Sequence, residues 1–368
     1  MYWLHAAPTR HRPPPGAPPR PTRPEPSERP KHGPRTAPRT AVPPPPGGGR
    51  RSAAGGTAVR RRDQSEKRTP MDFLRPDRWE DALAAKAEHP TAVPLAGGTD
   101  VMVEINFDHR RPSHLLDLTR IGDLYAWEAD GPDVRLGAAV PYARVIAELS
   151  GPLPGFALAA RTVGSPQIRN RGSVGGNLGA ASPAGDSHPA LLAAGAVVEA
   201  ESVRGTRLVP IDDFYTGVKR NALAPDELIR AVRVRKAAGP QQFAKVGTRN
   251  AMVIAVCAFG LALHPDTRTV RTGIGSAAPT PVRARAAEDF LAAALGEARC
   301  WDTGRPVPAA VAEEFAALAS AACNPIDDVR GSAAYRRRAV GVMARRTLGW
   351  AWREYTDGTT GERGELCA

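Results

Sequence analysis

The chain has 368 residues, of which 42% are hydrophobic, enough for two domains with ordinary cores and a tail. Its formal net charge of +12 invites a nucleic-acid interpretation, but residues 1–70 hold 15 Lys and Arg against 4 Asp and Glu, whereas residues 71–368 hold 35 against 34. This nearly neutral body implies no basic groove for nucleic acid, and no run approaches the ~20 apolar residues of a membrane span.

Residues 1–70 are expected to form a disordered, Pro/Arg-rich extension. They hold 17 of the 37 prolines and few large apolar residues, so they cannot bury enough surface to offset their ordering entropy. They lack the apolar core of a secretory signal. Binding to anionic polymers and a Pro-rich docking role are both open. The ordered pattern begins at Met71, which favours a third interpretation, an upstream extension from a mis-assigned start codon.

The cysteines are widely scattered and show no metal-binding or redox spacing, which favours a reducing cytoplasm and no iron–sulfur cluster on this chain. They are Cys257, Cys300, Cys323 and Cys367.

The first ordered unit is expected over residues 71–125. A strand at Phe73–Leu74, a helix capped by Asp77 and ending near His89, and a strand over 115–118 make a small α/β unit. Between the helix and the last strand, a short β-type segment leads into Leu95-Ala96-Gly97-Gly98-Thr99-Asp100-Val101, a glycine turn followed by another apolar segment.

The second unit is expected over residues 126–238. A strand over 134–138 precedes helices over 142–149 and 156–161. A helical turn over 191–194, a strand over 197–200 and a hairpin over 203–209 follow, and segments 211–215 and 227–232 complete an α+β unit.

A glycine-rich segment, residues 167–186, lies inside this unit and contains three glycines within five residues, Gly172, Gly175 and Gly176. Glycine allows positive φ and close approach of a ligand to the backbone, and successive N–H groups in such a turn form an anion nest. Asp186 offers an acceptor for a ribose-type hydroxyl. The alternative is a tight structural turn. Together with the first glycine segment, about seventy residues earlier, this segment predicts two cradles for one long diphosphate ligand. Neither has the spacing of a Rossmann fingerprint or a P-loop.

The last part, residues 240–356, contains within 241–263 an apolar stretch at 252–256 that predicts a buried strand or a strand pair. Residues 272–278 imitate a dinucleotide fingerprint, but Pro279 and Pro281 fall where its helix would propagate, so we reject that interpretation. Helices are expected over 282–295, 309–322 and 333–355. The arginines at 336–338 and 345–346 favour a solvated face or a subunit contact over a nucleic-acid helix.

The two glycine segments resemble those of the FAD-binding subunits of the molybdenum hydroxylases, which include the medium subunits of xanthine dehydrogenase and carbon monoxide dehydrogenase. The resemblance runs from about Met71 to about Trp352. It implies an α+β fold: a two-subdomain FAD-binding domain of the vanillyl-alcohol oxidase type over 71–238, a smaller α+β C-terminal domain over 240–356 and a tail over 357–368. The subdomains would be about 71–125 and 126–238, with the flavin between them.

The resemblance also implies roles for individual residues in binding FAD. The ADP–diphosphate part would be held by Ala96, Gly97, Gly98, Thr99, Asp100 and Val101. The diphosphate and flavin side would be held by Ser173, Val174, Gly175, Gly176 and Asn177, with Asp186 as a further contact and Ile229 packed near the flavin. Lys245 would stabilise negative charge on the reduced ring; without the resemblance it would be a surface lysine.

No catalytic residue and no metal ligand is assigned to this chain. No His or Cys lies inside either cradle, so FAD would be bound non-covalently. Asp186-Ser187-His188 does not form a hydrolase triad, because side chains adjacent in sequence cannot reach that geometry.

The resemblance implies two partner subunits, since the flavin itself carries the redox chemistry. A large partner would hold the molybdopterin site and a small one two [2Fe–2S] clusters, from which electrons pass to FAD and then to NAD or another acceptor. The alternative is a self-contained flavin-dependent alcohol or sugar oxidase or cell-wall precursor reductase, which would need an acid or base near the flavin. A basic binding protein acting through residues 1–70 is a further alternative.

Overall fold

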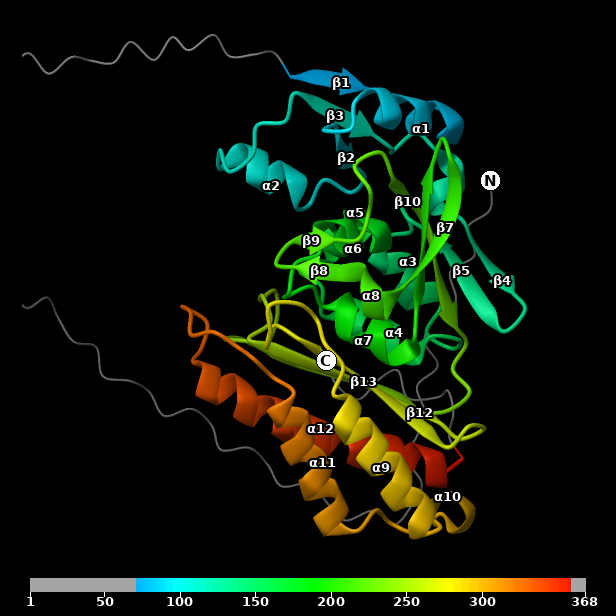
Figure 1. Cartoon of the computed structure of the whole chain (residues 1–368), viewed down its shortest axis with the longest axis vertical. Coiled ribbons are helices and arrows are strands. Elements are labelled where there is room, and N and C mark those ends of the chain that lie inside the picture. Colours follow the sequence, from blue (N-terminus) through cyan, green and yellow to red (C-terminus); the bar gives the residue numbers. More distant parts are fainter. Residues whose placement is uncertain (1–70, 359–368) are drawn as a thin grey trace, which may run out of the picture. The chain divides into compact units, whose positions relative to one another are not determined.

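The computed structural model describes residues 71–358, and Figure 1 shows their arrangement. The interpretations of residues 1–70 and of the tail beyond 358 lie outside the described residues. Within residues 71–358, no helix combines the length and the apolar character needed to cross a bilayer.

A three-stranded parallel sheet with the order β1-β3-β2 opens the fold. Helix α1 connects β1 to β2, and its Lys86 ends it by donating hydrogen bonds to the carbonyls of Pro90 and Ala92, at 2.8 and 2.7 Å. The predicted cap is wrong: Arg78 precedes the helix without a side-chain bond, and Asp77 pairs with Arg120 at 3.2 Å. The elements are β1 (Asp72–Leu74), α1 (Trp79–Glu88), β2 (Val93–Leu95), α2 (Val101–Asn106), β3 (His114–Asp117) and the 3₁₀ helix η1 (Gly122–Tyr125).

A five-stranded antiparallel sheet with the order β4-β5-β10-β6-β7 follows, and one continuous core links its helices to those of the first sheet. The predicted hairpin is confirmed as β6 and β7. The strands are β4 (Trp127–Asp130), β5 (Asp133–Gly137), β6 (Val197–Ser202), β7 (Gly205–Pro210) and β10 (Leu228–Arg235), with a small pair β8 (Tyr215–Gly217) and β9 (Arg220–Asn221). The helices are α3 (Tyr142–Glu148), α4 (Pro154–Arg161), α5 (Pro166–Arg171), α6 (Val174–Ala180), α7 (Ser187–Ala194) and α8 (Ile211–Phe214).

The C-terminal part is a three-stranded antiparallel sheet, β11-β12-β13, with its own core against the last helices. The rings of Phe259 on β12 and Phe315 on α11 meet edge to face, with centroids 6.3 Å apart. The elements are β11 (Gln241–Val246), β12 (Cys257–His264), β13 (Thr269–Gly275), α9 (Arg285–Glu297), α10 (Cys300–Thr303), α11 (Ala309–Ala321) and α12 (Ala333–Thr356).

Helix α7, which is buried along its whole length, joins the two parts by packing on β12 and β13 (Figure 1). Glycines on the strands make this possible: a Cβ at Gly273 would lie 2.0 Å from the Pro189 carbonyl oxygen, and one at Gly260 would lie 2.7 Å from it. The glycines of the false dinucleotide fingerprint therefore serve helix packing, because α7 can come this close only where the strand positions that face it carry no side chain.

The buried strand predicted at residues 252–256 is wrong, although a strand pair, β11 and β12, does form on either side of them. These residues form the tip between β11 and β12, where Met252 has a φ of +51° and both Met252 and Ile254 are exposed. An apolar run alone cannot distinguish a core strand from an apolar surface loop.

Arg336 does not belong to the solvated face expected for it. Its side chain is buried, and its Nη1 donates to the carbonyls of Val256 and Ser276 at 2.9 and 2.6 Å, while Nη2 pairs with Asp328. Arg337, Arg338, Arg345 and Arg346 are exposed, as that interpretation expects.

Gly273→Ala is expected to lower the free energy of unfolding by about 3 kcal/mol, because the new methyl group overlaps the Pro189 carbonyl and neither backbone can yield easily. Gly349→Ala is the matched control: nothing lies within 4 Å of its Cβ position on α12, so the change should stabilise the chain by about 0.4–1 kcal/mol. Urea unfolding of the two variants measures both effects. Equal stabilities would contradict the packing argument.

Arg336→Met is expected to cost about 3 kcal/mol, because it leaves two buried carbonyls and the Asp328 carboxylate without their donor. Arg346→Met on the exposed face of the same helix should change the free energy of unfolding by less than about 0.5 kcal/mol. Thermal unfolding at neutral pH compares the two variants. An equal loss of stability in both would contradict the stabilising role of the Arg336 hydrogen bonds.

Candidate cofactor site

The first glycine segment, residues 96–101, lies between β2 and α2. Gly98 takes a φ of +74°, which turns the chain so that Met102 N donates to the Gly98 carbonyl at 3.2 Å. Among residues 71–358, no carbonyl accepts a hydrogen bond from the N–H groups of Gly97, Gly98 or Thr99. Three consecutive free donors around a left-handed residue make an anion-binding concavity of the nest type.

The second segment differs from the open turn that its glycines suggest. Ser173 caps α6, and its Oγ accepts from Gly176 N at 3.1 Å. The two N–H groups between them donate to carbonyl groups that follow β5. Val174 N donates to Val140 O at 3.1 Å, and Gly175 N donates to Ala138 O at 2.8 Å. The prediction that these three N–H groups form an anion nest is therefore wrong, because each of them already donates to an acceptor within the chain.

The two segments touch each other. A Cβ at Gly97 would lie 1.9 Å from the carbonyl oxygen of Arg171, and the Cβ position of Gly172 lies 3.4 Å from Thr99 Oγ1. Residues about seventy positions apart in sequence thus form one continuous surface, as two halves of one binding site would require.

Asn177, on α6, is held by a buried chain of hydroxyl groups. Ser187 Oγ donates to Asn177 Oδ1 at 2.6 Å, and Tyr142 OH donates to Ser187 Oγ at 3.2 Å. Burial raises the pKa of Tyr142, so it stays a donor. Because its oxygen is engaged, Asn177 presents its NH₂ group as the donor.

Asp186 and Lys245 form a buried ion pair, with Oδ2 and Nζ 2.7 Å apart and side chains only 10% and 8% exposed. Lys245 Nζ also donates to the Thr162 carbonyl at 3.1 Å. Burial raises the pKa of Asp186 to about 6, although Lys245 opposes the shift. Lys245 is thus not a surface lysine, and its ammonium group neutralises Asp186.

The second oxygen of Asp186 is the most informative atom of the site. Asp186 Oδ1 is buried and has no hydrogen-bond partner within the described part of the chain. A buried carboxylate oxygen without a donor is costly, so its position fits a ligand that brings a hydroxyl or N–H group. The role of Asp186 as an acceptor for a ligand hydroxyl group stays a prediction.

Ile229 lies beside the second segment rather than in it. It is buried on β10 next to a β-bulge, and its Cδ1 is 3.9 Å from the Cβ position of Gly179 on α6. Asn221 Nδ2 donates to the Gly179 carbonyl at 2.9 Å from the other side. The structure therefore places Ile229 beside the second segment, and Lys245 reaches the same segment from the C-terminal sheet. Their roles in binding a cofactor stay predictions.

The rejected hydrolase triad is excluded by geometry as well. Asp186 turns to Lys245, Ser187 to Asn177, and His188 to the hydroxyl group of Tyr215, with Nδ1 and OH 2.7 Å apart. Burial lowers the pKa of His188 to about 3, so the ring is neutral.

The sequence analysis missed several supporting residues: Tyr142, Thr162, Ser187 and Tyr215. Only Ser187 lies next to a predicted site residue; the others come from distant segments and carry no motif.

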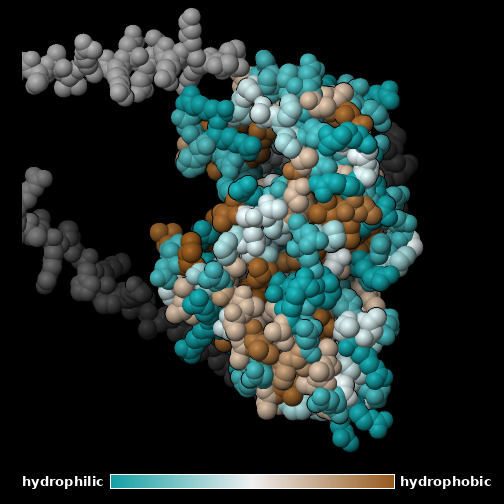
Figure 2. All heavy atoms as spheres, in the orientation of Figure 1, coloured by the Kyte–Doolittle hydropathy of each residue, from teal (hydrophilic) through white to brown (hydrophobic). Residues whose placement is uncertain are grey.

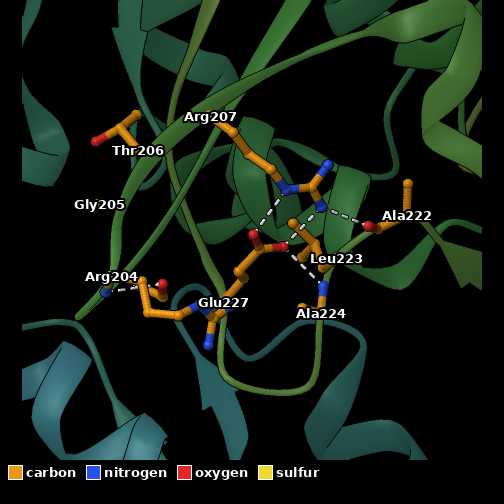
Figure 3. Close-up of a pocket in the computed structure, with 9 residues that line it drawn as sticks. Arg204, Gly205, Thr206, Arg207, Ala222, Leu223, Ala224 and Glu227 are labelled. Atoms are coloured by element: carbon orange, nitrogen blue, oxygen red, sulfur yellow. Dashed lines mark hydrogen bonds and ion pairs between the residues drawn. The ribbon is translucent and has the colours of Figure 1, made fainter.

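Two shallow cavities lie outside the glycine segments. The larger, about 440 Å³, is lined by residues of the β6–β7 hairpin and of the loop before β10. Figure 3 shows that Arg207 of this cavity points at Glu227, with Nε and Oε1 2.7 Å apart. Arg207 also donates to the Ala222 carbonyl. The charge inside is thus largely neutralised. The smaller, about 250 Å³, contains Tyr215, Arg283 and Arg285 beside Asp212.

Residues 69–236 match the FAD binding domain in molybdopterin dehydrogenase, and residues 242–351 match the CO dehydrogenase flavoprotein C-terminal domain. The chain is similar to the nicotinate dehydrogenase FAD-subunit of Eubacterium barkeri, with 31% identity over 237 residues that cover 61% of this chain and 80% of the relative. It is also similar to the carbon monoxide dehydrogenase medium chain of Afipia carboxidovorans, with 30% identity over 290 residues, 76% of this chain and 95% of the relative.

The fold has a counterpart among solved structures. A carbon monoxide dehydrogenase from Hydrogenophaga pseudoflava that lacks the Mo-pyranopterin moiety of its molybdenum cofactor superposes with a TM-score of 0.71 at 28% identity. The match covers 77% of this chain and 98% of that chain.

Asp186→Asn is expected to remove one pH dependence of stability. The folded pKa of Asp186, about 6, lies above its ordinary value of 3.8, so its contribution is fully present below pH 3.8 and is lost as the pH rises through 6. The difference in unfolding free energy between wild type and variant should therefore change by up to about 3 kcal/mol between pH 4 and 7. Because Lys245 also loses its acceptor, the slope is the readout; parallel curves would refute the shift.

Proposed function

Because the chain belongs to the family of FAD-binding subunits of the molybdenum hydroxylases, we propose that it is the electron-transfer flavoprotein of a multi-subunit dehydrogenase. It takes electrons from [2Fe–2S] clusters on a small partner and passes them to NAD or another acceptor. A large partner with molybdopterin carries out the substrate chemistry. The relatives act on compounds as different as nicotinate and carbon monoxide, which favours a substrate pocket on another subunit.

One observation carries the proposal: three free N–H groups and an unpartnered buried carboxylate oxygen belong to two segments that touch each other. The N–H groups of Gly97, Gly98 and Thr99 suit a diphosphate, and Asp186 Oδ1 suits a hydroxyl group. FAD contains both kinds of group, a diphosphate and the hydroxyl groups of its ribose and ribityl chain. FAD, when bound, supplies the redox chemistry and exchanges electrons one or two at a time.

The remaining site residues position the ligand and control its surroundings. Asn177, locked by Ser187, offers a donor of fixed direction. Ile229 adds a buried apolar side chain beside Gly179 of the second segment. Lys245 and Asp186 together carry no net charge. A flavin that gained negative charge on reduction would be attracted by the Lys245 ammonium group and repelled by the Asp186 carboxylate.

The cysteines agree with a cytoplasmic location, which we include in the proposal. Those within residues 71–358 are buried and unpaired, as expected in a reducing compartment.

Gly97→Ala is expected to weaken FAD binding about tenfold or more, because its methyl group would push the first segment off the Arg171 carbonyl and open the site. Gly122→Ala in the same part of the fold is the control, since nothing lies within 4 Å of its Cβ position. The flavin-to-protein ratio of the purified full-length chains measures the effect. A colourless wild-type chain that is folded and supplied with FAD would end the proposal.

A further inference from the structure

Two neighbouring loops expose large apolar side chains to solvent. The tip between β11 and β12 exposes Met252 and Ile254 by 56% and 59%, and the loop before α12 exposes Ile326 by 70% and Val329 completely. Figure 2 shows apolar residues gathered at the edge where the loop before α12 lies in Figure 1. We call these four residues the apolar loop surface. Large apolar side chains gathered at the surface in this way are typical of an interaction site.

The two loops are joined to each other by buried contacts. Val256 Cγ1 lies 3.1 Å from the Cβ position of Gly331, and the Arg336 guanidinium binds both the Val256 carbonyl and Asp328. The four apolar side chains therefore belong to one supported surface.

This surface is also tied to the candidate cofactor site. Ser276 N donates to the Pro183 carbonyl, within the second glycine segment, at 2.7 Å. The Ser276 hydroxyl donates to Ala255 O at 2.8 Å, and its carbonyl accepts from Arg336. In addition, β11 carries Lys245 and leads directly into the loop tip. A molecule bound to the loops would thus contact the same elements that hold Asp186 and Lys245.

Met252 is exposed at a position where its backbone conformation is strained. Its φ of +51° is unfavourable for a residue with a side chain, and the Arg249 side chain supports this conformation by donating to the Met252 carbonyl at 3.1 Å. Strain of this kind persists where the conformation serves a function.

The charges around the surface decide which occupant it fits. Residues 247–256 and 324–338 contain four arginines that reach the surface, at positions 249, 330, 337 and 338, besides the buried Arg336, and only two Asp. One of these two, Asp328, pairs with Arg336 and Arg330. Residues 1–70, with 15 basic against 4 acidic residues, would be repelled. A second copy would place the same arginines against each other. An acidic partner is favoured, since complementary charges select the partner.

We propose that the apolar loop surface, with its basic rim, is the docking face for the iron–sulfur partner, an inference that rests on the function proposed above. A [2Fe–2S] centre held by thiolates is anionic and needs a short path to the flavin. The surface provides complementary charge and a direct connection to the elements of the cofactor site.

The test compares the aspartate variant I326D/V329D with the matched variant V203D/L208D. Val203, in the turn between β6 and β7, is 58% exposed, and Leu208, on β7, is 57% exposed. Affinity-tagged full-length chains are expressed in the native host, and iron, molybdenum and FAD are measured in the purified complexes. Iron per FAD should fall about tenfold in the first variant and stay unchanged in the second. FAD per chain and thermal unfolding should match wild type in both.

A crosslink identifies the occupant directly. A photoreactive group attached at Val329→Cys should join the iron-containing chain, whereas one at Val203→Cys should not; both variants carry Cys367→Ser, since the cysteines at 257, 300 and 323 are buried. A crosslink to the molybdenum subunit, to a second copy or to residues 1–70 would overturn the proposal. Unchanged iron in I326D/V329D would overturn it while leaving the proposed function intact. A wild-type chain with FAD but without any iron-containing partner would remove both.

Discussion

The close contact of Gly97 with the Arg171 carbonyl is the constraint on which the rest of the site depends. A side chain at position 97 would place its first carbon 1.9 Å from that oxygen. Only a glycine allows the turn after β2 to rest on the end of α5. This contact puts the free N–H groups of the first segment next to Ser173 and α6. Without it, the chain would have two separate glycine turns and no shared binding surface.

The two segments contribute in different ways although both are rich in glycine. Within residues 71–358, the N–H groups of Gly97, Gly98 and Thr99 in the first segment have no carbonyl acceptor. In the second segment, Val174 and Gly175 donate to the backbone after β5, and Gly176 donates to Ser173 Oγ. A Cβ at Gly175 would lie 2.5 Å from Ala138 Cβ, so that glycine permits packing rather than ligand approach. The second segment thus provides a rigid wall, and its polar contribution comes from the side chains of Asn177 and Asp186.

Helix α7 connects the cofactor site to the C-terminal sheet. Its first turn directs Ser187 to Asn177 and His188 to Tyr215, and its Pro189 fits against the glycines of β12 and β13. Lys245 enters the site from β11 of that same sheet. The C-terminal domain is therefore part of the site, because it supplies the charge that neutralises Asp186 and the serine that holds Pro183. This continuity explains how a partner on the outer loops could stand close to the flavin.

The sequence by itself determined the family, the α+β fold and the residues of both glycine segments, because glycine, serine and aspartate at close spacing are local signals. It also separated the basic extension from the neutral body, since charge needs no structure to be counted. It could not show which N–H groups stay free, that Lys245 pairs with Asp186, or that Arg336 is buried. Nor could it tell that residues 252–256 form a loop that exposes Met252 and Ile254. These features depend on which distant segments meet, and a backbone donor, an ion pair or an apolar side chain acquires its role only from the atoms that the fold places against it.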